Sequence, residues 1–221
     1  MQKELYRVPI DGEWDLVDLD EFPRIYRQLY SVIYSFEGSF SASKRERIDE
    51  VFTRHPWKGG FSTINWFSDL YYVIPPKDRP QVLSMQYASP GWIDLGLFVG
   101  AAVSIRAMLI AISSAVRHVN ETYNQIQKGI HERKLNKLKL KETELKLDRE
   151  DMSFVIESCE QMAKLMGFKH LKQLHERTKN PYVSLKMLLA FYRRLRDLKE
   201  FEEKGKTRIC DEGNPTNRTR R

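Results

Sequence analysis

The stretch that decides the fold prediction is Leu95–Val116, which reads LGLFVGAAVSIRAMLIAISSAV. Arg106 is its single charged residue, and the other positions are apolar, small or Ser. Twenty-two helical residues rise about 33 Å, close to the thickness of the hydrocarbon core of a bilayer. The stretch therefore predicts an apolar helix over residues 92–116 that lies in a membrane or in the core of an oligomer.

Small residues recur at a spacing of four within this stretch, at Gly96, Gly100 and Ser104. On a helix this spacing forms a small-residue face, which allows two helices to approach closely in lipid. The same face is also compatible with tight packing in the core of a soluble oligomer. Arg106 is costly in mid-membrane, so it is expected to face a bundle interior or to form a ring in a pore. Alternatively, Arg106 and Asp94 mark the solvated side of a soluble helix.

Downstream, residues 94–166 contain no proline and few glycines, which predicts one nearly continuous helix. Its part over 117–167 is predicted as a coiled-coil rod, because apolar residues recur every seven positions. That row consists of Leu138, Leu145, Met152, Cys159 and Met166. Several companion positions are charged, so the heptad pattern is partial. Gly167 is expected to end the rod, and two helices are predicted within 168–205, over 168–178 and 182–203, with a break at Asn180-Pro181 and an end at Gly205. Residues 206–221 are predicted as a disordered basic tail.

Residues 1–91 are predicted as a small α+β domain with a sensory or regulatory role. We expect strands over 5–10, 14–17 and 82–88, a helix capped by Asp18 or Asp20 and ending near Glu37, and helices over 44–55 and up to Tyr72. The predicted fold class is thus mainly α: this domain, a long apolar-to-coiled-coil helix and a C-terminal helical hairpin, in an oligomer.

A candidate ligand site lies between two helices of this domain. Its glycines permit close backbone approach, its aromatic rings could stack a base, and its cations could meet phosphates. The candidate residues are Arg54, Trp57, Lys58, Gly59, Gly60 and Trp66. Arg45 and Arg47 are further cations for phosphate contacts. The alternative is an ordinary interhelix turn next to core aromatics.

The net charge of +7 is unevenly distributed. Residues 1–91 carry 11 Lys and Arg against 13 Asp and Glu, whereas residues 117–221 carry 25 against 16. The basic half suggests an anionic partner, either lipid headgroups or nucleic acid, unless it is a solvated helical surface. Neither cysteine has metal-ligand spacing, which suits a reducing compartment. No catalytic set is apparent, so we expect no enzyme activity, metal or cofactor.

The segment Tyr87-Ala88-Ser89-Pro90-Gly91, followed by an apolar helix and a Lys/Glu-rich rod, resembles a loose group of bacterial proteins linked to antiphage defence. In that group a strand ending in Ser-Pro-Gly precedes a coiled coil. Over about residues 80–165, the layout looks like that of membrane effectors of the Hailong defence system, which pair a nucleotidyltransferase with a channel-forming effector that senses short DNA oligomers. This resemblance implies a DNA-oligomer site in the N-terminal domain, a pore from residues 93–116 and a co-encoded nucleotidyltransferase partner.

The sequence therefore predicts a non-enzymatic, homo-oligomeric effector that acts on a membrane and is gated by a nucleotide or DNA oligomer. It would be cytoplasmic or associated with the inner membrane of a bacterium. The alternative is a soluble coiled-coil adaptor that binds a protein or nucleic acid, the latter through basic residues such as Arg193, Arg194 and Arg196.

Overall fold

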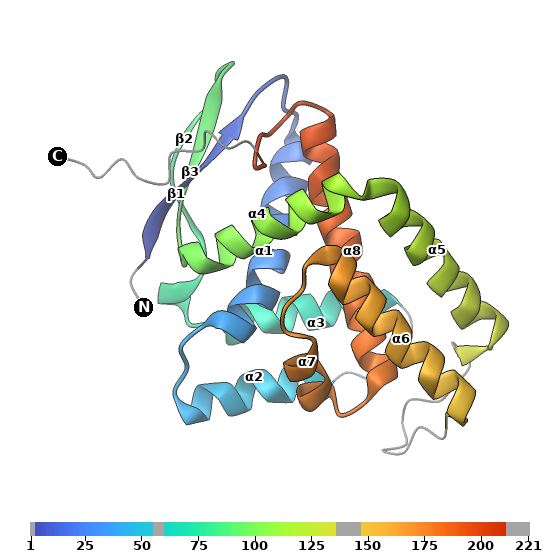
Figure 1. The fold of residues 1–221 in the computed structure, drawn as a ribbon. Helices are drawn as coiled ribbons and strands as arrows, with labels where there is room; N and C mark the ends of the chain where they lie inside the picture. The colour runs from blue at the N-terminus through green and yellow to red at the C-terminus, as the bar shows by residue number, and fades with distance from the viewer. Residues whose placement is uncertain (1–2, 55–59, 136–146, 211–221) are drawn as a thin grey trace.

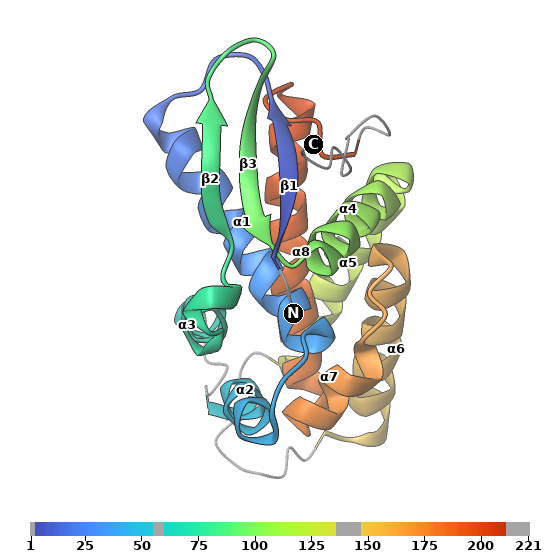
Figure 2. The same cartoon turned by 90° about the vertical axis from the view of Figure 1, so that its left-hand side faces the viewer.

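The computed structural model describes residues 3–54, 60–135 and 147–210, and these residues form a mainly helical fold with one small sheet. The sheet has three antiparallel strands, β1 (Glu4–Ile10), β2 (Gln81–Gln86) and β3 (Gly91–Leu97), in the order β1-β3-β2. Tyr6, Val8 and Ile10 alternate along β1 and are buried, as expected for a strand with one face on the core. Figure 2 shows this sheet in front of two long helices, α1 (Leu16–Glu37) and α8 (Pro181–Glu203).

Six further α-helices complete the described fold (Figure 1). They are α2 (Ala42–Arg54), α3 (Gly60–Val73), α4 (Val99–Ser114), α5 (Val116–Glu132), α6 (Arg149–Met166) and α7 (Leu171–Thr178). A short 3₁₀ turn, Pro76–Asp78, leads into β2. The predictions for β1, β2, α2, α3, α7 and α8 are confirmed to within a few residues, and the mainly helical class is confirmed with them.

The predicted strand over 14–17 is wrong, because α1 already begins at Leu16. Asp15 caps this helix: its side chain accepts a hydrogen bond from the Asp18 amide, and the Asp15 amide donates one to the Asp18 carboxylate. This reciprocal capping box satisfies two backbone donors and fixes the helix start three residues earlier than Asp18 would.

The predicted helix over 92–116 is wrong in its first third, because Gly91–Leu97 forms the central strand of the sheet. Leu95 lies opposite Tyr6 and Val82, and its alternation with Ile93 and Leu97 places all three on the core. On the other face, the Asp94 carboxylate accepts two hydrogen bonds from Arg7, at 2.7 and 2.8 Å. The apolar composition of residues 92–97 favoured a helix in the prediction, but pairing with β1 and β2 and the Arg7–Asp94 ion pair stabilise this segment as a strand.

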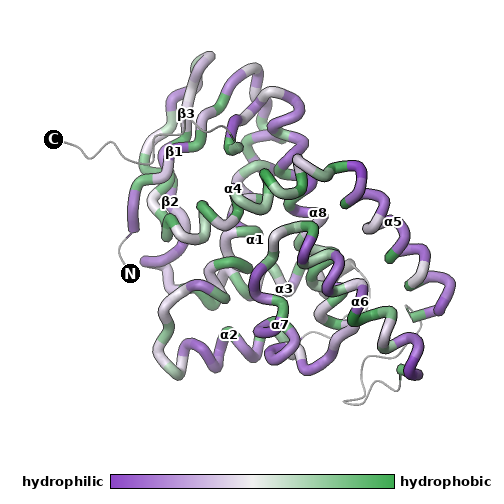
Figure 3. Tube along the Cα trace, in the orientation of Figure 1, coloured by the Kyte–Doolittle hydropathy of each residue, from purple (hydrophilic) through white to green (hydrophobic). Residues whose placement is uncertain are grey.

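The remaining apolar residues form α4, which bends by 91° into α5 at Ala115. Among the described residues, no single helix is long and apolar enough to cross a membrane; α4 and α5 pass that test only as a bent pair. Figure 3 shows α4 mostly apolar, whereas α5 is mixed.

The continuous helix predicted over 94–166 is also wrong, because α4, α5 and α6 are separate helices that pack on one another. Leu138 and Leu145 of the expected heptad row lie outside the described residues. Cys159 and Met166 are fully buried, and α6 packs chiefly against α8 of the same chain. Cys159 and Met166 therefore fill an intramolecular core, and the part of the chain that the structure describes shows neither a coiled coil nor an oligomer.

The chain beyond α8 folds back onto the sheet, which corrects the first part of the predicted disordered tail. Thr207 forms a β-bridge with Ile10, and the Asp11 amide donates to the Lys206 carbonyl at 3.0 Å. Ile209 is buried. We call residues 206–210 the C-terminal clasp; residues 211–221 lie outside the described part of the chain.

Candidate functional site

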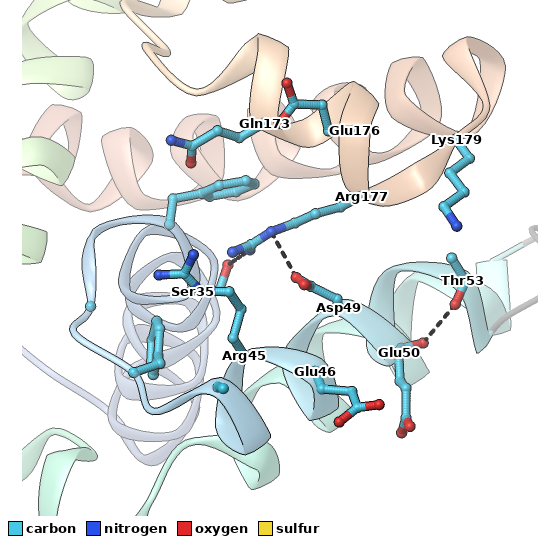
Figure 4. Close-up of a pocket in the computed structure, with 14 residues that line it drawn as sticks. Ser35, Arg45, Glu46, Asp49, Glu50, Thr53, Gln173, Glu176, Arg177 and Lys179 are labelled. Carbon is cyan, nitrogen blue, oxygen red and sulfur yellow. Dashed lines mark hydrogen bonds and ion pairs between the residues drawn. The ribbon is translucent and has the colours of Figure 1, made fainter.

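A groove with a volume of about 760 Å³ lies where the C-terminal end of α1 meets α2 and α7 (Figure 4). Its lining combines aromatic, polar and charged side chains. The lining residues are Ser35, Phe36, Gly38, Phe40, Ala42, Arg45, Glu46, Asp49, Glu50, Thr53, Gln173, Glu176, Arg177 and Lys179. The lining residues of α1 and α2 are thus at least 120 positions from those of α7 in the sequence, and only the tertiary fold brings them together.

Arg177, in the last turn of α7, is the most firmly held of these side chains. Its Nε lies 3.0 Å from Asp49 Oδ1, and its Nη1 donates to Ser35 Oγ at 3.5 Å. Its guanidinium also lies over the rings of Phe36 and Phe52, at 4.7 and 5.1 Å from the centroids. These contacts fix the orientation of the guanidinium between three helices, with 14% of the side chain exposed.

The electrostatic environment of Arg177 is unfavourable in one respect. Burial lowers the pKa of its guanidinium, Asp49 raises it, and the positive charge of Arg45 lowers it further. Figure 4 shows the Arg45 side chain, from α2, ending beside Ser35 on the same side of the groove as Arg177. Two like charges therefore converge on this side of the groove, where Asp49 is the carboxylate that pairs with Arg177, and an anion bound between the two guanidinium groups would relieve their repulsion.

The rim of the groove limits the kind of anion that fits. Glu46, Glu50 and Glu176 line it and would repel an extended polyanion. Lys179 adds one more cation, and the partly buried Phe40 ring packs edge-on against Tyr34 at 5.3 Å. The lining therefore suits a compact anion that also carries a flat apolar group.

Of the predicted ligand residues, Arg54 and Trp66 do not line this groove. Arg54 ends α2 on the surface, where it pairs with Glu50 and Asp69 at 3.5 Å. Trp66 is 1% exposed, with its ring against Phe52 and Phe67, so it offers no face to a base. Gly60 begins α3, and Trp57, Lys58 and Gly59 lie outside the described residues.

The predicted pore residues do not share a helix face, because Gly96 lies in β3 and Gly100 in the first turn of α4. Ser104 donates to Glu37 Oε1 at 2.7 Å and so ties α4 to α1. Arg106 Nε and Nη2 donate to the carbonyls of Ile209 and Cys210, at 3.1 and 3.3 Å. Arg106 thus holds the C-terminal clasp of its own chain. This contact accounts for the buried charge of Arg106 without a ring of arginines in an oligomeric pore.

The basic residues of the alternative adaptor hypothesis are engaged within the chain. Arg194 pairs with Asp197 at 2.6 Å, and Arg193 donates to the Tyr123 hydroxyl at 3.4 Å. The Arg196 guanidinium lies 6.0 Å from the Tyr123 ring centroid. The Arg194 pair lies within α8, whereas the contacts of Arg193 and Arg196 with Tyr123 join α8 to α5.

The structure also brings together a serine and a histidine that sequence reasoning did not pair. His175 Nδ1 lies 2.9 Å from Ser184 Oγ, which in turn lies 2.6 Å from Thr178 Oγ1. Ser184 is fully buried, so a substrate cannot reach its hydroxyl. The cluster instead satisfies polar groups where α7 meets α8.

Of the groove residues, Arg45 was among the cations expected to meet phosphates, whereas Arg177 was missed. Arg177 lies in an ordinary basic stretch, and its partners Asp49 and Ser35 are remote in the sequence. No known protein family matches this chain, and comparisons with curated proteins and with solved structures find no similar protein.

Proposed function

We propose that this protein is a non-enzymatic, homo-oligomeric effector that binds a small phosphorylated ligand of the nucleotide class in the α1–α2–α7 groove. The observation that carries the proposal is the convergence of Arg45 and Arg177 on one groove of about 760 Å³. Guanidinium groups bind phosphate oxygens with paired hydrogen bonds, and a second guanidinium strengthens the attraction.

The other lining residues support a nucleotide over longer nucleic acids. The Phe40 ring offers a partly exposed apolar surface for a base, and the Gln173 amide and Thr53 hydroxyl add hydrogen-bonding groups. The carboxylates of Glu46, Glu50 and Glu176 disfavour an extended phosphate backbone. We therefore narrow the predicted ligand from a nucleotide or DNA oligomer to a mono- or dinucleotide.

Titration calorimetry of the full-length chain with ADP, pyrophosphate and adenosine tests this proposal. We expect ADP to bind best, pyrophosphate more weakly, and adenosine least, since it lacks the phosphates that Arg45 and Arg177 would hold. Arg45→Gln should weaken ADP binding about 10- to 100-fold, because a hydrogen bond to a charged group contributes roughly 1.5–3 kcal/mol.

Arg47→Gln is the matched control, because Arg47 is also exposed on α2 but does not line the groove. The proposal fails if ADP shows no binding at about 1 mM, or if the two variants lose affinity equally. The role in antiphage defence stays a prediction of the resemblance. Phage plating on cells that express the wild type or Arg45→Gln tests it separately.

A further inference from the structure

Helix α4 is apolar on both of its faces, although just one of them packs against the rest of the chain. Its inner face consists of the buried residues Ala101, Ala102, Ile105, Met108, Leu109 and Ile112. Its outer face carries Val103, Ala107, Ile110 and Ser114, all exposed; Val103 and Ile110 are 52% and 44% exposed. We call these four residues the outer stripe. A helix face made of apolar and small residues is normally covered, so the outer stripe indicates a covered surface.

The outer stripe has the spacing and the charge pattern of a helix–helix contact. Its residues are separated by four, three and four positions, which aligns them along one seam of the helix. The single charge of α4, Arg106, donates to the Ile209 and Cys210 carbonyls of the C-terminal clasp. The stripe itself is therefore uncharged and can face an identical stripe without repulsion.

We infer that the outer stripe is the interface with a second copy of this chain, in which the two α4 helices pack antiparallel about a two-fold axis. In this arrangement Val103 lies opposite the partner's Ser114, and Ala107 opposite the partner's Ile110. Each larger side chain then meets a smaller one, so the two helices can approach closely.

Charges at the two ends of α4 are complementary in the same arrangement. Glu4 is exposed and pairs with Leu97, two residues before the helix, so it lies at the N-terminal end of α4. Arg117 is exposed and follows the helix at its other end. An antiparallel pair brings each Glu4 toward the Arg117 of the other copy, and this complementarity selects a second copy as the occupant.

A bilayer is a poorer fit for the outer stripe. The 16 residues of α4 rise about 24 Å, which is shorter than the hydrocarbon core of roughly 30 Å, and the chain turns by 91° at the end of the helix. The inference rests on the homo-oligomeric part of the proposed function and gives that assembly an interface. It does not depend on the nucleotide groove.

Light scattering and sedimentation of the full-length chain test this interface. We expect a dimer at about 10 μM for the wild type, and a dissociation constant at least about 30-fold higher for Ile110→Glu, which places two carboxylates at the contact. Ile64→Glu is the matched control, because Ile64 is 55% exposed on α3, outside the stripe. Circular dichroism of both variants verifies that they fold.

A charge exchange tests the antiparallel register without changing the stripe. Glu4→Lys and Arg117→Glu should each weaken the dimer, and the double variant should restore it. If the wild type is a dimer and Ile110→Glu remains a dimer, the proposed interface is wrong but the homo-oligomer stands. If the double variant does not restore the dimer, the antiparallel register is wrong.

Two other outcomes also overturn the inference, and they can be told apart from failure of the nucleotide groove. A monomeric wild type refutes the homo-oligomer as well, and ADP titration of the same sample shows whether the groove proposal stands. If the wild type is a monomer that floats with vesicles of anionic phospholipid, and Ile110→Glu does not float, the outer stripe binds a membrane surface instead.

Discussion

Arg106 on α4 and Arg177 on α7 are both partly buried, but their surroundings give them different roles. Arg106 donates to two backbone carbonyls of the C-terminal clasp, so its hydrogen bonds close a structural contact. Arg177 pairs with one carboxylate, stacks on two rings and lies within the field of Arg45 at the groove. An arginine in an apolar context therefore does not by itself indicate function. A second arginine close enough to repel it, at the same groove, is the more informative observation.

The largest effect that separates the two regions is expected from Arg177→Ala. The substitution removes the ion pair with Asp49 and two cation–π contacts that join α1, α2 and α7. We expect the free energy of unfolding to fall by about 2–3 kcal/mol, less than for a fully buried pair because Asp49 is partly exposed. Urea denaturation measures this. Arg177→Lys keeps the charge and should recover part of the loss, whereas a loss below about 0.5 kcal/mol in Arg177→Ala contradicts the assigned role.

A smaller and more local effect is expected from Arg106→Ala. Loss of the two hydrogen bonds to Ile209 and Cys210 should lower the free energy of unfolding by about 1–2 kcal/mol. Release of the clasp should also speed tryptic cleavage after Lys206 and Arg208. Arg47→Ala, on the exposed face of α2 and away from the clasp and the outer stripe, is the control. Equal cleavage rates in the wild type and Arg106→Ala would show that the clasp is held by other contacts.

The sequence predicted the elements whose signals are local. The alternation of Tyr6, Val8 and Ile10, the proline-bounded start of α8 and the positive-φ Gly167 after α6 each act within a few residues. It failed where tertiary pairing overrides composition. Leu95 to Leu97 look like the start of an apolar helix, but β1 and β2 flank them as strands and Arg7 neutralises Asp94.

The candidate site was predictable only in part. Arg45 could be named because it is a cation on a short polar helix of the N-terminal region. Arg177 could not, because its significance arises from Asp49 and Ser35, more than 120 residues away. Trp66 shows the opposite error: an aromatic beside glycines suggested base stacking, yet the ring fills the core between Phe52 and Phe67.

A weaker, pH-dependent effect should come from His175, one turn before the end of α7. Burial lowers its pKa, and Glu160 opposes this in part, so the folded protein prefers the neutral ring beside Ser184. Because the folded pKa lies below the unfolded value of about 6.5, the contribution to stability is full above pH 6.5 and is lost as the pH falls through the folded pKa.

Thermal unfolding between pH 7.5 and pH 5 measures this contribution. The wild type should lose more stability over that range than His175→Gln, whose neutral amide does not titrate. Identical pH profiles for the two proteins would show that the wild-type loss arises from groups other than His175.

The smallest effect on stability is expected from Arg45→Ala, and it is the sharpest test of the contrast between the two regions. Arg45 is exposed, and its charge disfavours the charged form of Arg177, so its removal should change the free energy of unfolding by less than about 0.5 kcal/mol and should not reduce it. The same variant should lose affinity for ADP. A residue whose removal leaves the fold intact and weakens binding serves a ligand, whereas Arg106→Ala should weaken the fold and leave ADP binding unchanged. If Arg45→Ala instead destabilises the protein as much as Arg106→Ala does, the groove is another structural contact and the distinction between the two arginines disappears.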